Sequence, residues 1–399
     1  MPNDRSRVDG IARVITRLNI GGPSIQATRL TTALDSHGFH TTLLHGRLGD
    51  GEGDMSYLLP ANADVRYIAT LCRPLSPLDD LRTLIRLYSE FRRRSPRIVH
   101  THMAKAGLLA RLAAAAHNLT RGSAPRARIV HTYHGHVLDG YFSPLATKVF
   151  ITLERILAKL SDRIIAISPA IQSELLRTYR IGREDQYRVV PLGFDLSPFA
   201  AIDATARAAA RRDLNLPGDA LVVSTVGRLT AIKQHRLFLD TIKRVSETHT
   251  NVIALIAGDG ELRDDIVAYA ASLGLTDRVR MLGWRRDLAT IYAATDVFLL
   301  TSRNEGTPVA LIEAMASGVP GVSTDVGGVK DVIGGIETGR TAAFGDVDGL
   351  AAAINGLLAD PSLRAATGEA ARQRVLARYD IARLVADIAT LYRELLADS

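Results

Sequence analysis

Short apolar runs alternate with longer amphipathic segments along nearly all of the 399 residues. The short runs are rich in β-branched residues, which favours strands, and the longer segments repeat apolar residues at helical spacing. In the first half the predicted strands are Ala12–Leu18, His40–His45, Val65–Ala69, Ile98–Thr101, Ile129–Thr132, Ile164–Ile167 and Arg188–Pro191. In the second half they are Leu221–Val226, Val252–Ile256, Val279–Leu282, Val297–Leu300 and Gly321–Ser323. The clearest helical segments are Ser24–Ser36, Leu78–Arg93, Gly107–His117 and Leu145–Asp162.

This alternation is typical of α/β proteins, in which helices cover both faces of parallel sheets. The length predicts two doubly wound, Rossmann-like domains in tandem, and two such domains facing each other enclose an inter-domain cleft. We expect domains of residues 1–195 and 196–375, with a C-terminal helix in 376–399 that packs back on the first domain. Ligands of such sheets bind beyond the carboxyl ends of the strands, so candidate site residues should follow predicted strands.

The composition indicates a soluble globular protein, with 47% hydrophobic and 23% charged residues. We find no apolar run long enough to cross a bilayer and recognise no signal peptide. The single Cys72 excludes an intramolecular disulfide and a cysteine-rich metal site. These features predict a cytoplasmic protein.

Positive charge is concentrated in the first half of the chain. Residues 1–195 contain 27 Lys and Arg against 17 Asp and Glu, whereas the remainder contains 22 against 25. Such an excess attracts nucleic acids or anionic membranes. No zinc-finger, RNA-binding or basic-zipper signature accompanies it, so we expect an anionic membrane surface and no nucleic acid. The segment Leu145–Asp162 has an apolar stripe and a basic face that suit this contact, although most such helices are ordinary surface elements.

Two carboxylates, Glu305 and Glu313, stand eight positions apart across a predicted loop-to-helix junction. Thr307 is a good N-cap and Pro308 suits the first helical position. The unpaired amides from Gly306 onward and the positive end of the helix dipole then face the space between the carboxylates. Such a site suits an anionic, hydroxyl-rich ligand, although an isolated pair of glutamates is more often solvated surface acid.

Further candidate groups follow other predicted strands. Gly21 and Gly22 form a glycine-rich turn after the first strand, which by itself is a weak signal and lacks a full dinucleotide fingerprint. Arg228 and Lys233 follow the first strand of the second half and can grip a diphosphate, or be two solvated cations. Gly258 lies in a flexible turn after the next strand. The sequence Leu282-Gly283-Trp284 places apolar groups where a nucleobase could lie.

Histidines cluster near two strands of the first half. His131, His134 and His136 surround one strand end, and His100 and His102 lie one strand earlier. Because alternate residues of a strand point to opposite faces, we expect these side chains not to converge, and no acidic ligand flanks them, so we expect no metal site. A strand-end His134 that hydrogen-bonds a substrate hydroxyl is the preferred interpretation, and a satisfied buried histidine is the alternative.

Together these motifs resemble those of the retaining nucleotide-sugar glycosyltransferases of family 4, of the bacterial polysaccharide-biosynthesis type, which have the GT-B fold. The resemblance covers essentially the whole chain. It rests on Glu305 and Glu313 as an E-x7-E motif, on Gly227-Arg228-Leu229 with Lys233, and on Gly258-Asp259-Gly260. One departure is Gln234, where the family usually has glycine after the lysine.

The resemblance implies roles for individual residues. Arg228 and Lys233 bind the donor diphosphate, Glu313 binds ribose, and Glu305 with the following amides holds the transferred sugar. His134 matches the family's catalytic-site histidine, and the first glycine pair lies under the donor phosphates. The implied catalytic residues are His134, Glu305, Arg228 and Lys233, and the donor-binding residues are Gly21, Gly22, Arg228, Lys233, Gly258, Glu305, Gly306, Thr307, Pro308 and Glu313.

The implied activity is metal-independent retaining transfer of a hexose or N-acetylhexosamine from a nucleoside-diphosphate sugar, with no cofactor. A UDP-sugar is favoured and GDP-mannose is the chief alternative. The acceptor is expected to be a polyprenyl-diphosphate-linked or other saccharide of exopolysaccharide, capsule or lipopolysaccharide biosynthesis. The enzyme would then be cytoplasmic, with possible peripheral contact at the inner face of the plasma membrane. A nucleotide-sugar 2-epimerase of the same fold remains a rival.

Overall fold

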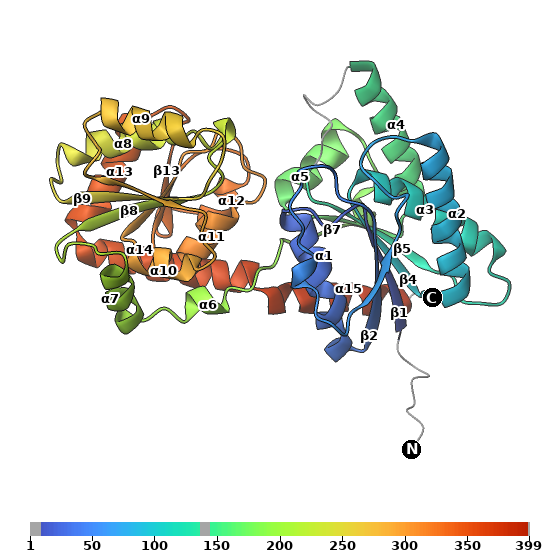
Figure 1. The fold of residues 1–399 in the computed structure, drawn as a ribbon. Helices are drawn as coiled ribbons and strands as arrows, with labels where there is room; N and C mark the ends of the chain where they lie inside the picture. The colour runs from blue at the N-terminus through green and yellow to red at the C-terminus, as the bar shows by residue number, and fades with distance from the viewer. Residues whose placement is uncertain (1–8, 136–143, 398–399) are drawn as a thin grey trace. The chain divides into compact units, whose positions relative to one another are not determined.

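The computed structural model describes residues 9–135 and 144–397. The chain forms two compact α/β units, one of Met1–Phe194 with Ile381–Ser399 and one of Asp195–Asp380. Each unit is built on its own parallel sheet (Figure 1). The chain therefore leaves the first unit at Phe194 and returns to it at Ile381, five residues beyond the start of the C-terminal helical segment expected from the sequence.

The first unit has a seven-stranded sheet in which every neighbouring pair is parallel. Its strands are β1 (Asp9–Ile15), β2 (Phe39–His45), β3 (Asp64–Tyr67), β4 (Ile98–His102), β5 (Arg128–Tyr133), β6 (Arg163–Ala166) and β7 (Tyr187–Val189). The order is β3-β2-β1-β4-β5-β6-β7, so the direction of strand addition reverses between β1 and β4. Such a reversal opens a crevice at the carboxyl ends of the two strands.

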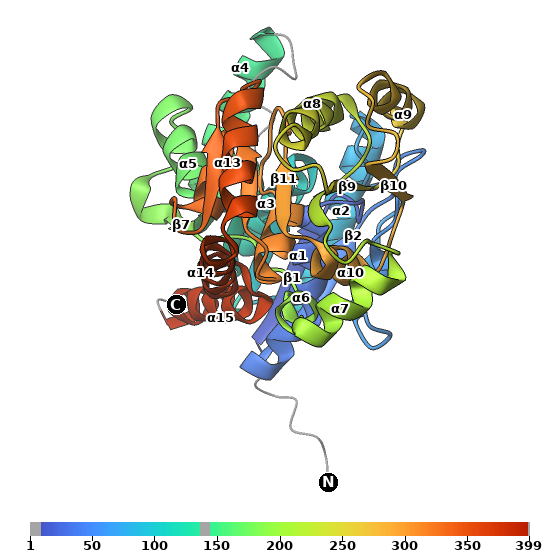
Figure 2. The same cartoon turned by 90° about the vertical axis from the view of Figure 1, so that its left-hand side faces the viewer.

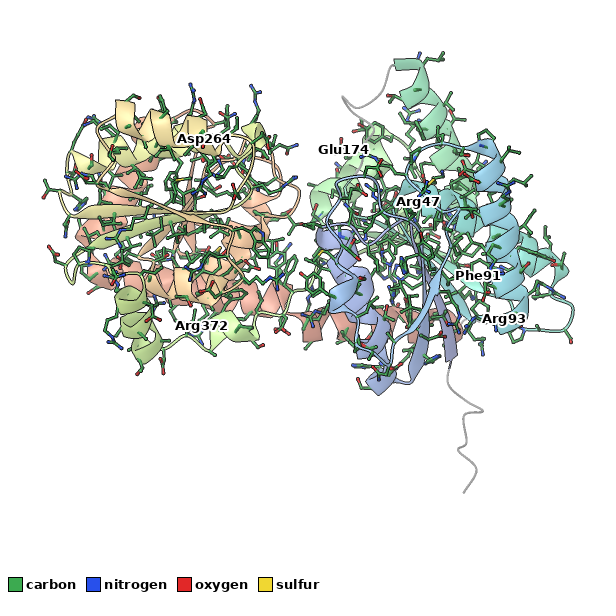
Figure 3. The ribbon with its side chains drawn as sticks, viewed as in Figure 1. Arg47, Phe91, Arg93, Glu174, Asp264 and Arg372 are labelled. Atoms are coloured by element: carbon green, nitrogen blue, oxygen red, sulfur yellow. The ribbon has the colours of Figure 1, made fainter. Side chains whose placement is uncertain are left out.

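Helices cover both faces of this sheet. On one face, α1 (Gly22–Ala33) and α15 (Ile381–Ala397) pack against Ile11, Ile98 and Val130. On the other, α2 (Pro77–Arg94) and α3 (Ala104–Thr120) pack against alternate residues of the same strands, with α4 (Pro144–Leu160) beside α3. In α2, Phe91 is buried in this core while Arg93 lies on the outer surface (Figure 3). The shorter elements are η1 (Leu34–His37), η2 (Ser56–Leu58), α5 (Pro169–Ser173), η3 (Glu174–Thr178) and η4 (Glu184–Gln186).

The second unit has a six-stranded parallel sheet. Its strands are β8 (Leu221–Val226), β9 (Val252–Ala257), β10 (Val279–Gly283), β11 (Val297–Leu300), β12 (Gly321–Thr324) and β13 (Gly339–Ala342), in the order β10-β9-β8-β11-β12-β13. The reversal here lies between β8 and β11. The sequence did not predict β13, because Gly-Arg-Thr-Ala contains no apolar run.

The helices of the second unit also lie on both faces of its sheet. One face is covered by α8 (His235–Ser246), α9 (Arg263–Ser272) and α13 (Val347–Ala359), with α13 beside α8 (Figure 2). On the other, α7 (Ala204–Asp213) packs against α10 (Leu288–Ala294), and α11 (Val309–Ala316) packs against α14 (Pro361–Tyr379). The remaining elements are α6 (Ser197–Ala200), η5 (Ala231–Lys233) and α12 (Val329–Ile333). Among the described residues, no helix combines the length and apolar character needed to cross a bilayer.

The C-terminal helix contributes to the core of the first unit, and this generates a stability prediction. Ile388 of α15 is fully buried against the β-sheet core, so Ile388→Ala should lower the free energy of unfolding by about 2–5 kcal/mol. Hydrogen exchange should accelerate in β1 and β4 and stay unchanged in β8 and β11. Thr390→Ala, at an exposed position of the same helix, is the matched control. Equal acceleration in both sheets would contradict the assignment of α15 to the first unit.

Candidate active site

In the second unit, two predicted site residues meet where the strand order reverses. Lys233 lies in the connection after β8, and Glu305 lies in the loop after β11. The Nζ atom of Lys233 is 2.6 Å from Oε1 of Glu305, and the hydroxyl of Ser302 donates to the same oxygen at 2.5 Å. The amide of Arg303 donates to the carbonyl of Ile232 at 2.8 Å and joins the two loops. Sequence reasoning found the acid and the cation but did not single out Ser302.

The backbone around Arg228 is closely packed. Gly258 has φ +141°, and a Cβ atom there would lie 1.8 Å from the carbonyl oxygen of Gly227. Glycine is therefore required where the ends of β8 and β9 approach each other. Arg228 itself is exposed, and within 9–135 and 144–397 its guanidinium has no hydrogen-bond or ion-pair partner. The structure thus presents an unpaired cation on the same loop as Lys233.

Gln234, the departure from the family pattern, adopts a left-handed conformation with φ 54° and ψ 47°. This explains a preference for glycine at the position, because the conformation strains residues with a Cβ atom. The turn is nevertheless kept. The hydroxyl of Thr301 approaches the carbonyls of Lys233 and Gln234 at 3.1 Å each, and these contacts hold the loop beside β11.

The helix after Glu305 begins one residue later than predicted. Pro308, with ψ 85°, occupies the N-cap position and α11 starts at Val309, so the prediction of Thr307 as a capping residue is wrong. Proline is rigid and fits the transition from loop to helix. The backbone amides of Gly306 and Thr307 have no hydrogen-bond acceptor in the described part of the chain, which leaves them available to a ligand.

A second glycine pair, which the sequence analysis missed, supports this loop. The amide of Gly328 donates to the carbonyl of Glu305 at 2.9 Å. A Cβ atom at Gly327 would lie 2.0 Å from that carbonyl oxygen, and one at Gly328 would lie 2.0 Å from the carbonyl oxygen of Gly306. The signal was two adjacent glycines just after a predicted strand.

Glu313 has a different environment from Glu305. It lies on α11, and the hydroxyl of Tyr292 on α10 donates to its Oε2 atom at 3.0 Å. Burial raises the pKa of Glu313 to about 7, and the bond from Tyr292 offsets part of that rise. The two glutamates share no hydrogen-bond partner among the described residues. Glu305 is thus ion-paired, while Glu313 is poised between its charged and neutral forms near neutral pH.

In the first unit, the predicted glycine pair lies at the corresponding reversal. Gly21 occupies the N-cap position of α1 and Gly22 begins that helix, just beyond the carboxyl end of β1. A Cβ atom at Gly22 would lie 3.0 Å from a methyl group of Leu192, so the helix start packs closely against the chain after β7. Because glycine has no side chain, a ligand at this strand end could approach the backbone of the turn closely.

The expectation that the histidines do not converge is wrong for three of them. His100, His102 and His134 lie on one face of the sheet, with His102 Nδ1 and His134 Nε2 2.9 Å apart. His131 points to the opposite face, where its Nδ1 atom is 2.7 Å from the hydroxyl of Thr101, and His136 lies outside the described residues. Residues two apart on β4 share a face, and β5 brings His134 to the same face.

These histidines surround an arginine. Arg13 Nη1 lies 3.1 Å from His102 Nε2 and 3.3 Å from His100 Nδ1. Burial, with a further contribution from the Arg13 charge, lowers the pKa of His134 to about 3. Of the residues that the structure describes, no group of His, Cys, Asp or Glu side chains is arranged to hold a metal ion.

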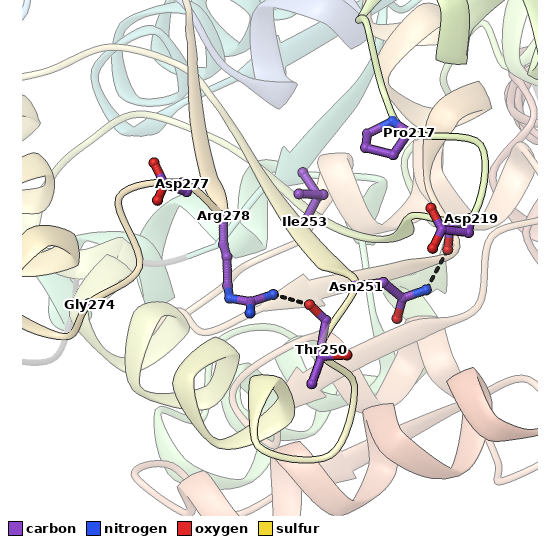
Figure 4. Close-up of a pocket in the computed structure, with 8 residues that line it drawn as sticks. All are labelled: Pro217, Asp219, Thr250, Asn251, Ile253, Gly274, Asp277 and Arg278. Atoms are coloured by element: carbon purple, nitrogen blue, oxygen red, sulfur yellow. Dashed lines mark hydrogen bonds between the residues drawn. The ribbon is translucent and has the colours of Figure 1, made fainter.

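A surface pocket in the second unit lies at the opposite end of the strands from Lys233 and Glu305. It is lined by Pro217, Asp219, Thr250, Asn251, Ile253, Gly274, Asp277 and Arg278 (Figure 4). These residues precede or begin β8, β9 and β10, so the pocket is at the amino edge of the sheet. The side chains of Arg278 and Asn251 donate to the carbonyls of Thr250 and Asp219. The candidate site residues lie at the carboxyl edge, and none of them lines this pocket.

Two family models match the chain. The model described as Glycosyltransferase Family 4 matches residues 20–198, and the model described as Glycosyl transferases group 1 matches residues 206–374. The Escherichia coli UDP-Gal:alpha-D-GlcNAc-diphosphoundecaprenol alpha-1,3-galactosyltransferase is 28% identical over 352 residues, covering 87% of this chain and 88% of that protein. The lipopolysaccharide core biosynthesis mannosyltransferase LpcC of Rhizobium leguminosarum bv. viciae is 30% identical over 263 residues, covering 65% of this chain and 72% of that protein.

The fold is also that of solved glycosyltransferase structures. The Anabaena protein Alr3699/HepE, in complex with UDP, superposes with a TM-score of 0.80 at 21% identity, over 96% of this chain and all of that one. The matched models cover the two units in turn, and the parallel sheets with their reversals are those that the sequence resemblance implied. The chain belongs to the family 4 glycosyltransferases of the GT-B fold.

Proposed function

We propose that this glycosyltransferase moves a hexose or N-acetylhexosamine from a UDP-sugar to a lipid-linked or saccharide acceptor, with retention at the anomeric carbon. The observation that carries the proposal is the contact between Lys233 and Glu305, together with Arg228 on the loop of Lys233, whose guanidinium has no partner among the described residues. A cation pair suits a diphosphate, and a fixed carboxylate suits sugar hydroxyls.

The leaving diphosphate develops negative charge as the sugar departs. Arg228, Lys233 and the amides of Gly306 and Thr307, which have no acceptor in the part of the chain that the structure describes, stabilise that charge. In this proposal they replace a divalent metal ion. When Lys233 turns to a phosphate oxygen, Glu305 keeps its hydrogen bond from Ser302. Its carboxylate therefore stays oriented toward the sugar.

The same geometry supports a proposal for the mechanism. Glu305 is held by Ser302 and Lys233, which makes it an orienting group and not a free nucleophile. We propose that the acceptor hydroxyl attacks from the face that the diphosphate leaves. The bond to the acceptor oxygen forms as the bond to the diphosphate breaks, and a diphosphate oxygen takes the acceptor proton.

The choice of donor is supported by relatives. The E. coli relative is named for UDP-Gal, and the Anabaena structure contains UDP. The Rhizobium relative is named as a mannosyltransferase, so GDP-mannose is kept as the alternative donor. Both curated relatives are transferases, which does not favour a 2-epimerase.

The acceptor proposal combines these names with the surface of the first unit. One relative acts on a diphosphoundecaprenol-linked sugar and the other in lipopolysaccharide core biosynthesis. On α4, Leu145, Val149 and Ile156 are exposed, and on α2 so are Leu78, Leu81 and Ile85. Lys148 and Arg82 lie among these apolar residues. We propose that this apolar and basic surface of α2 and α4 brings the enzyme to an anionic bilayer that carries the acceptor.

Kinetics test the assignment of Lys233. Lys233→Ala should lower kcat/KM with the preferred UDP-sugar by roughly 100- to 1,000-fold, because a charge-stabilising group is lost. Lys243→Ala, at an exposed position of α8, should leave the rate unchanged. An unaltered rate for Lys233→Ala would remove the residue from the site. Turnover of GDP-mannose and of no UDP-sugar would overturn the donor assignment.

The pKa of Glu313 predicts a pH-dependent stability. Because its folded pKa of about 7 lies above the ordinary 4.5, the folded state binds the extra proton, and stability falls as pH rises through this range. Glu313→Gln should therefore stabilise the unliganded protein more at pH 8 than at pH 5. The gain at pH 8 should be about 3 kcal/mol at most.

Chemical denaturation at the two pH values measures this difference, with Glu261→Gln at an exposed position as the control. The same variant should bind the UDP-sugar more weakly, because a carboxylate that accepts from ribose hydroxyls is lost. Equal stabilisation at both pH values would show that burial does not hold the Glu313 proton.

Flotation tests the membrane surface. The protein should float with phosphatidylglycerol vesicles and less with phosphatidylcholine vesicles. Val149→Glu combined with Leu81→Glu should reduce flotation, because these substitutions place negative charge on the apolar and basic surface of α2 and α4. Ile336→Glu, an exposed position of the second unit, should not change it. Equal flotation with both lipids would argue against an anionic surface.

A further inference from the structure

A buried column of polar side chains crosses the face of the first sheet that α1 and α15 cover. It consists of Arg13 on β1, His100 and His102 on β4, His134 after β5 and Tyr392 on α15. Arg13, His100, His102 and Tyr392 have no exposed surface. Buried polar groups are costly when they are unpaired, and among the described residues two nitrogen atoms of this column, Arg13 Nε and His134 Nδ1, have no hydrogen-bond partner.

The strand register builds the column. Arg13 is paired in register with His100, and Ile15 with His102, in the parallel ladder of β1 and β4. His100 and His102 lie on one face and their rings stack with centroids 4.4 Å apart. The guanidinium of Arg13 contacts both rings through its Nη1 atom.

Arginine fixes the direction of these bonds because its guanidinium can donate but cannot accept. Arg13 Nη1 lies 3.1 Å from His102 Nε2, so the histidine nitrogen is the acceptor. Burial holds the pKa of His102 well below its ordinary value, so the ring is neutral and carries its single proton on Nδ1. That N–H donates to His134 Nε2 at 2.9 Å.

The hydrogen bond from His102 also determines which nitrogen of His134 carries the proton. Its Nε2 atom accepts from His102, so the neutral ring carries its proton on Nδ1. This Nδ1 atom is shielded from solvent and has no hydrogen-bond partner within the described parts of the chain. The column therefore ends, at the carboxyl end of β5 and beside the reversal between β1 and β4, in an N–H donor that has no acceptor among the described residues.

Tyr392 completes the column from the C-terminal helix. Its hydroxyl accepts from Arg13 Nη2 at 3.2 Å and donates to His100 Nδ1 at 2.6 Å. His100 Nε2 then donates to the hydroxyl of Thr132 at 2.7 Å. Tyr392 thus pairs the second terminal nitrogen of Arg13, while the bond from Arg13 to His102 does not pass through it.

We infer that Arg13, acting through His102, fixes His134 as a hydrogen-bond donor whose Nδ1–H binds an oxygen of the sugar substrate. His134 then orients substrate and does not act as a general base, since its other nitrogen is already occupied by His102. Arg13 and His102 are positioning residues. The ligand assignment rests on the proposed function, whereas the tautomer of His134 does not.

Long-range 1H–15N correlation spectra of the full-length, unliganded protein with 15N-labelled histidine test the tautomer. The His134 proton should reside on Nδ1. In Arg13→Met the constraint is removed and the Nε2–H form should appear, while Arg13→Lys, which keeps a cation that only donates, should restore the Nδ1–H form. Tyr392→Phe is the matched control and should keep it, because the bond from Arg13 to His102 remains. An Nε2–H His134 in the wild-type protein would overturn the inference.

Substitution of His134 itself provides a test that leaves the other members of the column, Arg13, His100, His102 and Tyr392, unchanged. In His134→Asn an amide N–H can occupy the place of Nδ1–H, whereas in His134→Gln the amide reaches the place of Nε2. We expect His134→Gln and His134→Ala to lose roughly 10- to 100-fold in kcat/KM and His134→Asn to lose less. Greater retention by His134→Gln would contradict the donor role. If the wild-type protein transferred no sugar while His134 carried its proton on Nδ1, the proposed function would fail. The assignment of Arg13 and His102 as the residues that fix this tautomer would then stand.

Discussion

The ion pair between Lys233 and Glu305 depends on β8 and β11 being neighbours in a parallel sheet. The two residues are far apart in sequence, and only the reversal of strand order brings the loops after these strands to one place. The same reversal between β1 and β4 assembles Arg13 with His100 and His102 in the first unit. The parallel topology therefore determines which residues lie close together. The chemistry of their side chains then determines which ligand they can bind.

The two reversals differ in their electrostatics. The second unit presents the cations Arg228 and Lys233 with a carboxylate, and charged groups of this kind suit a diphosphate and the sugar attached to it. The first unit presents neutral imidazoles around a buried guanidinium, and burial keeps the pKa values of His100 and His102 low. A neutral N–H donor suits hydroxyl oxygens and does not compete for phosphate charge.

Much of the fold and part of the site could be predicted from the sequence. Alternating apolar runs gave the parallel sheets, except for β13, whose Gly-Arg-Thr-Ala sequence has no such run. The sequence predicted that Lys233 and Glu305 belong to one site, because both follow predicted strands and both match motifs of the family. The histidine column was missed because each strand was considered alone, and a face shared by β1, β4 and β5 depends on a register that no local pattern encodes. The predicted start of α11 was one residue too early, because Thr307 and Pro308 are both residues that favour a helix start.

Gln234 shows how backbone strain and site geometry are connected. A residue other than glycine in the left-handed region costs about 1–2 kcal/mol, and such strain persists only where the surroundings hold it. Here the hydroxyl of Thr301 engages the carbonyls on both sides of the turn, and the amide of Arg303 binds the carbonyl of Ile232. These contacts come from the loop after β11, the loop that also carries Glu305. The loop that carries Glu305, the ion-pair partner of Lys233, therefore also holds the strained turn at Gln234. The position of Lys233 is thus set by contacts to the backbone of the turn and does not depend on the ion pair alone.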